Sequence, residues 1–398
     1  MENNILMNLR KFLVPEIVYG VGALQLVGHH AGNFGATKVL VVTDPGIHAA
    51  GWVSKVEKSL GESGIPYVVY MNITPNPKDR EVMEGAEICR LEGCDLIVAV
   101  GGGSPMDCAK GIGVMTGNTG HILDYKGVDE VPNPGPPLIF VPTTAGSSAD
   151  VSQFAIVTDT SKNLKTAIVS KMVVPDIALV DPETTLTMSK ELTAATGMDA
   201  LCHAFEAFVS TASSALTDMA ALSAVRIISK DLLEAYRNPG QLTFRNQMMM
   251  ASLMAGLAFS NASLGLVHAM AHSLGGLLDL PHGECNAVLL EKVVAFNYST
   301  VPEKYDQLAA AMGLDVEGEV PQDRAAILEN EIGSLREQLG ISSSLADRGG
   351  SLSDISLLAT YAFDDPCLAT NPRVATQEDI LGVFREVYQC SETAKKRP

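Results

Sequence analysis

"IVAVGGGSPMDCAKG", residues 97–111, is the stretch that decides the fold of this 398-residue chain. A run of apolar and β-branched residues leads into three glycines, and a helix-forming pattern follows from about Pro105. Proline is favoured in the first turn of a helix, because the backbone N–H that it lacks would have no partner there. The stretch therefore predicts a buried strand, a tight glycine turn and a helix that begins near Pro105.

Short apolar runs bounded by turn residues recur through the first half of the chain, and helical patterns such as residues 79–93 separate them. Strands that alternate with helices are typical of a parallel α/β sheet. Residues 154–170 predict a hairpin beside this sheet, and residues 176–185 predict its last strand. The other predicted strands cover residues 37–44, 66–70, 94–103 and 137–146.

From about residue 186 onward, Ala, Leu and Met recur at helical spacing and clusters of β-branched residues become rare. We therefore predict two domains: an α/β domain over residues 1–185, with a Rossmann-like parallel sheet, and an all-helical domain over residues 186–398. A cleft between two such domains is a common place for a cofactor and a substrate to meet.

The composition narrows the class of function. The chain carries 46 acidic and 28 basic residues, a formal net charge of −18. Such a surface repels a polyanion, so we expect no nucleic-acid partner. The seven cysteines are scattered without a C-x-x-C pair, which is typical of free thiols in a reducing compartment. The N-terminal residues lack the pattern of a secretory signal peptide. We therefore expect a cytoplasmic protein.

Residues 246–278 contain no Asp, Glu, Lys or Arg, and an apolar run of that length is long enough to span a bilayer. Asn, Gln, Ser and His side chains interrupt the run, however, and each would need a hydrogen-bond partner in lipid. The flanks carry neither a Lys/Arg pattern nor an aromatic belt. We expect buried helices here and no membrane partner.

The glycines at 101–103 allow a backbone to approach a pyrophosphate closely, and a helix N-terminus stabilises the negative charge. The pattern is not G-x-G-x-x-G, so a purely structural turn is the alternative. A second polar loop, "PTTAGSSAD" at residues 142–150, follows another predicted strand end, where ligands of α/β sheets bind. Asp44 closes the strand at 37–44 and favours NAD over NADP, since a carboxylate accepts from a ribose hydroxyl and repels a 2′-phosphate. The alternative for Asp44 is a helix cap.

Two histidine-containing pairs in the second half have the spacing of one helical turn. Asp199 and His203 form the first pair, His268 and His272 form the second, and His282 follows in a loop. A single such histidine is more often an ordinary core residue, but several buried imidazoles and a carboxylate need shared partners, and a divalent cation provides one. The spacing leaves open which four of these five residues bind.

With these motifs in order, the whole chain resembles the iron-containing (group III) alcohol dehydrogenase family, which has a dehydroquinate synthase-like architecture. The C-terminal "DPCLATNPRVAT" resembles the branch of NAD-dependent methanol and 1,3-propanediol dehydrogenases. "AGSSAD" departs from the usual family pattern, which leaves the roles of Ser148 and Asp150 open, and Cys285 is equally unassigned. The motifs that carry the resemblance are "GGGSPMDCAKG", "PTTAGSSAD", "DPETTLTM", "ATGMDALCHAFEAF", "GLVHAMAHSLGG", "PHGECNA" and "NPR".

The resemblance implies one divalent metal, Fe²⁺ first, although a mixed oxygen and nitrogen donor set also suits Zn²⁺, Mn²⁺ or Ni²⁺. The implied metal ligands are Asp199, His203, His268 and His282. His272 is then left beside the substrate and the nicotinamide. The implied NAD contacts are Asp44, Asn76, Gly102, Gly103, Ser104, Asp107, Thr143, Thr144, Lys165 and Leu186.

The expected function is the interconversion of a small primary alcohol or diol and its aldehyde, with hydride transfer to or from NAD(H). His272 is our candidate for the proton relay, since an imidazole accepts and passes on protons near neutral pH. Two alternatives stay open: an NAD-recycling lyase or cyclase of the same fold, and an inactive metal-binding protein. The resemblance also implies a homo-oligomer, a dimer or larger.

Overall fold

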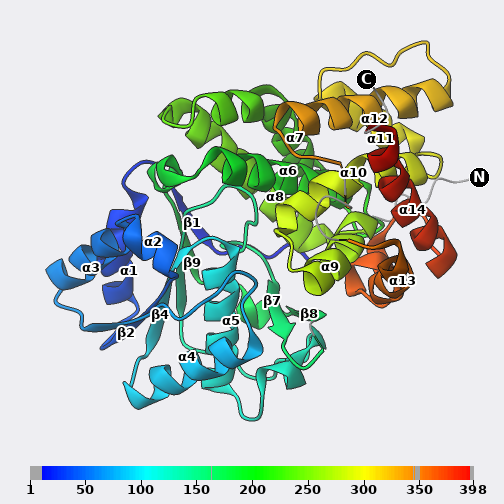
Figure 1. Ribbon diagram of the computed structural model, residues 1–398. Coiled ribbons are helices and arrows are strands. Elements are labelled where there is room, and N and C mark those ends of the chain that lie inside the picture. Colours follow the sequence, from blue (N-terminus) through cyan, green and yellow to red (C-terminus); the bar gives the residue numbers. More distant parts are fainter. Residues whose placement is uncertain (1–10, 163, 344, 346–349, 395–398) are drawn as a thin grey trace, which may run out of the picture.

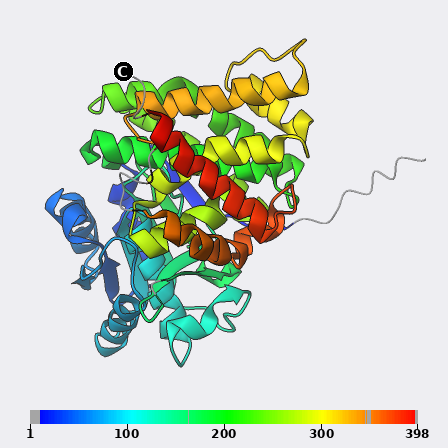
Figure 2. The same cartoon turned by 45° about the vertical axis from the view of Figure 1, so that its right-hand side comes forward.

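The computed structural model describes residues 11–162, 164–343, 345 and 350–394. Strands and helices alternate in the first half of the chain, and helices make up almost all of the second half. Figures 1 and 2 show the helical half packed along one side of the sheet. The predicted α/β half followed by a helical half is confirmed. The predicted boundary at residue 185 lies within the 3-10 helix Pro182–Thr187 and stays a prediction.

Six parallel strands form the main sheet, in the order β1-β9-β6-β4-β2-β3. Every residue of β2, β4, β6 and β9 is buried, as expected for a parallel sheet that is covered on both faces. The sequence prediction missed only the edge strand β1 among these six. The strands are β1 (Glu16–Tyr19), β2 (Val39–Val42), β3 (Tyr67–Tyr70), β4 (Leu96–Gly101), β6 (Leu138–Pro142) and β9 (Ile177–Val180).

Alternate residues of these strands pack on two different helix layers. Val39 and Val41 of β2 lie in one apolar core with α1 (Val27–Asn33) and α3 (Trp52–Glu62). Leu40 and Val42 lie in the opposite core, with the helices α4 (Asp79–Leu91) and α5 (Gly103–Gly117). The period-2 geometry of a strand explains this division.

The helix that follows β4 begins two residues earlier than predicted. Only Gly102 separates the end of β4 from the start of α5 at Gly103, so Pro105 lies within the first turn. The predicted hairpin is confirmed: β7 (Phe154–Asp159) and β8 (Leu164–Val169) pair antiparallel, and β5 (Gly127–Val128) adds to β8 in a separate small sheet.

The helical half surrounds one apolar core that also contains Ala178 and Val180 of β9. Helix α6 is buried along most of its length and packs against α7, α8 and α10. At the contact with α10, a Cβ on Gly283 would lie 2.2 Å from the backbone oxygen of Ala195, so only glycine allows this approach. The helices are α6 (Lys190–Val209), α7 (Ala215–Arg237), α8 (Leu242–Ala262), α9 (Leu266–Leu278), α10 (His282–Tyr298), α11 (Pro302–Ala311), α12 (Pro321–Gln338), α13 (Ile355–Phe363) and α14 (Gln377–Ala394).

The uncharged run at residues 246–278 forms most of α8 and all of α9, and these two helices meet at an angle of 101°. In the part of the chain that the structure describes, no single helix is long and apolar enough to cross a membrane. The bent pair meets the length and composition criteria only when both helices are taken together.

No disulfide joins the six cysteines whose side chains are described.

Candidate metal centre and cofactor cleft

Three helices of the second half bring the predicted metal ligands together. Asp199 and His203 come from α6, His268 comes from α9, and His282 is the first residue of α10. The Oδ1 atom of Asp199 lies 3.8 Å from the Nε2 atom of each of the three histidines. The donor atoms of Asp199, His268 and His282 all lie within 4.8 Å of one another, and His203 stands outside this tighter group.

The imidazole rings are oriented by hydrogen bonds at their Nδ1 atoms. Nδ1 of His203 lies 3.2 Å from the carbonyl oxygen of Gly146, and Nδ1 of His268 lies 2.6 Å from Oε2 of Glu206. Because these acceptors have no proton to give, each Nδ1 carries a proton. When such a ring is neutral, its lone pair is on Nε2, which faces Asp199.

Two buried polar atoms at this centre lack a hydrogen-bond partner among the described residues, Nδ1 of His282 and Oδ1 of Asn286. The amide nitrogen of Asn286 donates to Oδ1 of Asp199 at 2.6 Å and lies 3.1 Å from Nε2 of His268. A buried carboxylate and three imidazole nitrogens that face it are costly together unless a cation joins them. The donor set of one oxygen and three nitrogens therefore fits a divalent first-row metal.

Electrostatics within the protein favours the neutral, ligating form at two of the three histidines, whereas a metal ion would have to displace a proton from the third, His268. Burial raises the pKa of Asp199, but the neighbouring His203, His268 and His282 outweigh it and hold this pKa well below its usual range. Burial lowers the pKa of His203 to about 4 and that of His282 well below its ordinary value. Both rings are therefore neutral at pH 7 and available as ligands. Burial also opposes the charged form of His268, yet hydrogen bonds with Asp199 and Glu206 raise its pKa to about 9.

The predicted cofactor residues follow the carboxyl ends of three adjacent parallel strands. Asp44 comes after β2, Gly102 and Gly103 after β4, and Thr143 and Thr144 after β6. A Cβ on Gly102 would lie 3.1 Å from the side chain of Thr144, so the two loops leave little room for a side chain there. Among the residues that the structure describes, no side chain caps α5, and the buried Oγ1 of Thr143 has no hydrogen-bond partner. These features fit an anionic group bound at the helix N-terminus.

The other predicted cofactor residues lie around the same cleft. The backbone N–H of Asn76 donates to Oγ of Ser104 at 3.2 Å, and its side chain donates to Asp279, the residue after α9, at 3.0 Å. Burial raises the pKa of Asp107 to about 6, against the effect of Lys110 and Lys165. Leu186 is half-buried in the 3-10 helix after β9.

Asp44 does cap a helix. Its Oδ1 accepts a hydrogen bond from the backbone N–H of Ile47 at 3.0 Å, at the start of α2 (Pro45–Ala49). The helix cap that the sequence offered as an alternative role for Asp44 is thus observed. The contact of Asp44 with a ribose stays a prediction.

A cavity of about 80 Å³ lies at the metal centre, and Asp107 is the predicted cofactor residue that lines it. Its apolar wall is made of Phe154, Ile156, Phe259 and Leu264. Phe259 stacks on His203 with 4.2 Å between the ring centroids. The cavity is also lined by Asp107, Ser147, Ala149, Ser152, Asp199, His203, His268, His272 and His282.

His272 lies on the cavity one turn after His268, and its Nδ1 is 2.8 Å from Oδ2 of Asp365. Asp365 comes from the distant C-terminal segment and also accepts from the backbone N–H of Cys367. Because Asp365 binds Nδ1, Nε2 of His272 carries the free lone pair. His272, Asp365 and Cys367 form a second group whose donor atoms lie close together.

Sequence reasoning missed Glu206, Asn286 and Asp365. A Glu inside the otherwise apolar helix that carries Asp199 and His203 was a usable signal, since a buried acid needs a partner. The partner of Asp365 is 93 residues away and had no local signal.

The sequence left the roles of Ser148, Asp150 and Cys285 open, and the structure places these three residues in buried positions. Ser148 donates to the backbone oxygen of Ser252 at 2.7 Å, and Asp150 is buried near Lys110, with a pKa that burial raises to about 6. Cys285 is buried in α10.

Two family models match almost the whole chain: "Iron-containing alcohol dehydrogenase" matches residues 15–182, and "Fe-containing alcohol dehydrogenase family, C-terminal" matches residues 193–388. The 1,3-propanediol dehydrogenase of Citrobacter freundii is 42% identical over 95% of this chain and 98% of its own. The NAD-dependent methanol dehydrogenase of Bacillus methanolicus is 38% identical over 94% and 98%. A crystal structure of a 1,3-propanediol oxidoreductase superposes with a TM-score of 0.92 at 40% identity, over 96% of this chain and all of the other. The chain belongs to the iron-containing alcohol dehydrogenase family.

Proposed function

We propose that this protein interconverts a small primary alcohol or diol and its aldehyde, with NAD(H) as the hydride carrier and a divalent metal at the active site. The observation that carries the proposal is one cavity that is lined both by the donor set of Asp199 and three histidines and by Asp107 of α5, the helix that begins at the glycine turn. Two of the relatives described above are named as dehydrogenases of 1,3-propanediol and of methanol. These relatives do not support the two alternative functions, an NAD-recycling lyase or cyclase and an inactive metal-binding protein.

The metal is held by Asp199, His203, His268 and His282 in this proposal. When bound, the ion acts as a Lewis acid that acidifies the alcohol hydroxyl. Iron is the first choice because of the family to which the chain belongs. The four residues come from three packed helices, so the donor atoms are positioned before substrate arrives and little reorganisation is needed.

The residues at the carboxyl edge of the sheet would hold NAD, which would supply the hydride acceptor. The N-terminus of α5 and the hydroxyl of Thr143 would bind its phosphates, and Asp44 would accept from its ribose. The remaining contacts are Asn76, Gly102, Gly103, Ser104, Asp107, Thr144, Lys165 and Leu186.

His272 takes up the hydroxyl proton at Nε2 and passes it toward solvent. Asp365 keeps the ring in the tautomer with a free Nε2 lone pair and stabilises the imidazolium that forms. The apolar wall of Phe154, Ile156, Phe259 and Leu264 excludes water from the reacting carbon and limits the length of the substrate.

The proposal extends to a cytoplasmic homo-oligomer, a dimer or larger, without a nucleic-acid or membrane partner. It rests here on the family resemblance and on the net charge of −18.

After anaerobic loading with Fe²⁺, we expect the protein to reduce NAD⁺ with methanol, ethanol or 1,3-propanediol. Asp199→Ala and His282→Ala should lose bound metal and activity together, because each removes one donor atom of a four-residue set. The exposed His48 serves as the matched control, since His48→Ala should keep both. Metal content after dialysis and NADH formation are the measurements. Full activity in a metal-free variant would contradict the ligand assignment.

The preference for NAD is tested by Asp44→Ser. Serine still caps α2, so the melting temperature should stay close to that of the parent. The lost carboxylate no longer repels a 2′-phosphate, and the ratio of kcat/KM for NADP⁺ to that for NAD⁺ should rise at least about 10-fold, or about 1.4 kcal/mol. An unchanged ratio would leave Asp44 with its capping role alone.

The role of Asp365 is tested by Asp365→Asn. An amide cannot stabilise an imidazolium as a carboxylate does, so we expect kcat to fall by about 10-fold or more while the metal content stays at the parent level. The pH profile of kcat should also shift. The exposed neighbour Asp364 offers the control Asp364→Asn, which should behave as the parent. A parent-like pH profile in Asp365→Asn would speak against the relay.

A further inference from the structure

Glu206 is a buried carboxylate that the proposed chemistry does not use. It lies on α6 one turn after His203, and its residue is 4% exposed. Within the described part of the chain, no lysine or arginine forms an ion pair with Glu206. Its side-chain partner is the imidazole of His268. A buried carboxylate without a cationic partner is costly, so its other contacts must compensate for the charge.

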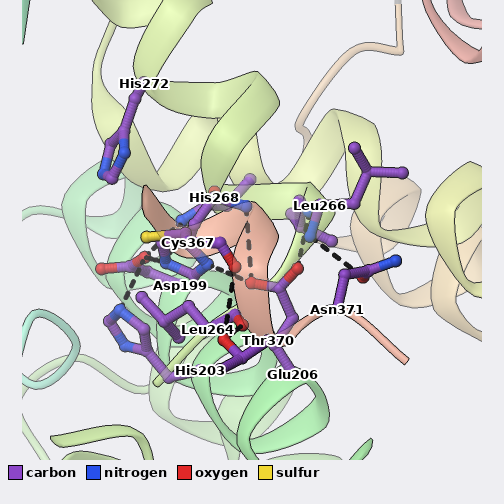
Figure 3. A network of polar contacts seen from close by, with 12 residues as sticks. Asp199, His203, Glu206, Leu264, Leu266, His268, His272, Cys367, Thr370 and Asn371 are labelled. Carbon is purple, nitrogen blue, oxygen red and sulfur yellow. Dashed lines mark hydrogen bonds and ion pairs between the residues drawn. The ribbon is translucent and has the colours of Figure 1, made fainter. Parts of the chain in front are cut away.

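These contacts all lie at the start of α9 (Figure 3). Oε1 of Glu206 accepts from the backbone N–H of Val267 at 2.6 Å, and Oε2 accepts from the backbone N–H of His268 at 3.4 Å. Gly265 precedes α9 and offers no side-chain cap. Asn371 supplies the remaining bond by accepting from the N–H of Leu266 at 3.1 Å. Glu206 is therefore a helix cap provided from another helix, and the dipole of α9 stabilises its charge.

The same carboxylate also binds the imidazole of His268. Oε2 lies 2.6 Å from Nδ1, which is a short, charge-assisted hydrogen bond. On the opposite side of the ring, Nε2 faces Oδ1 of Asp199 at 3.8 Å. Figure 3 shows His268 between Asp199 and Glu206, so the ring has one acidic partner at each nitrogen.

We propose that Glu206 is the positioning residue that makes His268 a metal ligand, because it holds a proton on Nδ1 and so leaves Nε2 to face the ion. The proposal rests on the metal site proposed above.

The variant Glu206→Gln isolates this role because it keeps the size and shape of the side chain. An amide has one acceptor and one donor end, whereas the carboxylate accepts at both. If the amide oxygen accepts from Val267, the NH₂ group meets Nδ1–H of His268. If the amide is turned round, the NH₂ group meets the N–H of Val267. The first arrangement favours a proton on Nε2, which blocks the ligand position.

A matched control separates capping from positioning. Asn371 caps the same helix at Leu266 but has no hydrogen bond with an imidazole. Asn371→Ala should lower the melting temperature and leave metal affinity within about threefold of the parent. Glu206→Gln should instead weaken metal binding by about 10- to 100-fold, the usual effect of losing such a partner.

The experiment measures the dissociation constant of Co²⁺ for the full-length parent and both variants, by competition with a chromophoric chelator, and records the visible spectrum of bound Co²⁺. We expect weaker binding and an altered spectrum in Glu206→Gln alone. Affinity in Glu206→Gln within threefold of the parent would overturn the proposal, as would an equal loss in Asn371→Ala. A parent that binds no Co²⁺ would instead overturn the metal site itself.

A second measurement needs no variant at position 206 and covers the case in which Glu206→Gln does not fold. In the Zn²⁺-loaded parent with ¹⁵N-labelled histidine, the NMR signals of His268 report which ring nitrogen carries the proton. The proposal requires a proton on Nδ1 with the chemical shift of a strong hydrogen bond. A His268 signal without that hydrogen-bonded proton would contradict it.

Discussion

Two carboxylates on one face of a buried helix are the constraint on which the helical half depends. Asp199 and Glu206 lie two turns apart on α6, with His203 between them, and neither has a lysine or arginine at ion-pair distance among the described residues. Burying such charges is costly unless every oxygen has a partner. The positions of α9 and α10 supply those partners. The first turn of α9 binds Glu206, the His268 ring joins the two acids, and Asn286 of α10 donates to Asp199.

The sheet half is tied to this centre by its loops. The loop after β6 holds Thr143 and Thr144 at the predicted cofactor edge, and three residues later it presents the carbonyl oxygen of Gly146 to His203. Ser148 of the same loop donates to α8. One short segment therefore orients an imidazole of the metal centre and anchors the cleft. The predicted metal and cofactor sites therefore share one segment of backbone.

Local patterns carried most of what could be predicted from the sequence. Apolar runs bounded by glycine predicted β2, β4 and β6, because buried parallel strands have a local signature. The i,i+4 pairs brought out Asp199, His203, His268 and His272 as candidates, since helical spacing is also local.

The strand β1 was missed because its four residues are partly exposed and pair only with β9, more than 150 residues away. Asp365 and Asn286 were missed for a similar reason, because their roles arise only when distant segments meet. The start of α5 was placed too late, since Pro105 marks the first turn but not its first residue.

The central claim is that Asp199, His203, His268 and His282 hold one metal ion while His272 is left for the proton. The structure offers a rival group in His272, Asp365 and Cys367, whose donor atoms also lie close together. A crystal structure of the metal-loaded protein, with anomalous scattering data collected at the absorption edge of the metal, decides between them. The account predicts a single anomalous peak between Oδ1 of Asp199 and the Nε2 atoms of the three ligand histidines. A peak on Asp365 and Cys367, or one that includes Nε2 of His272, would contradict it.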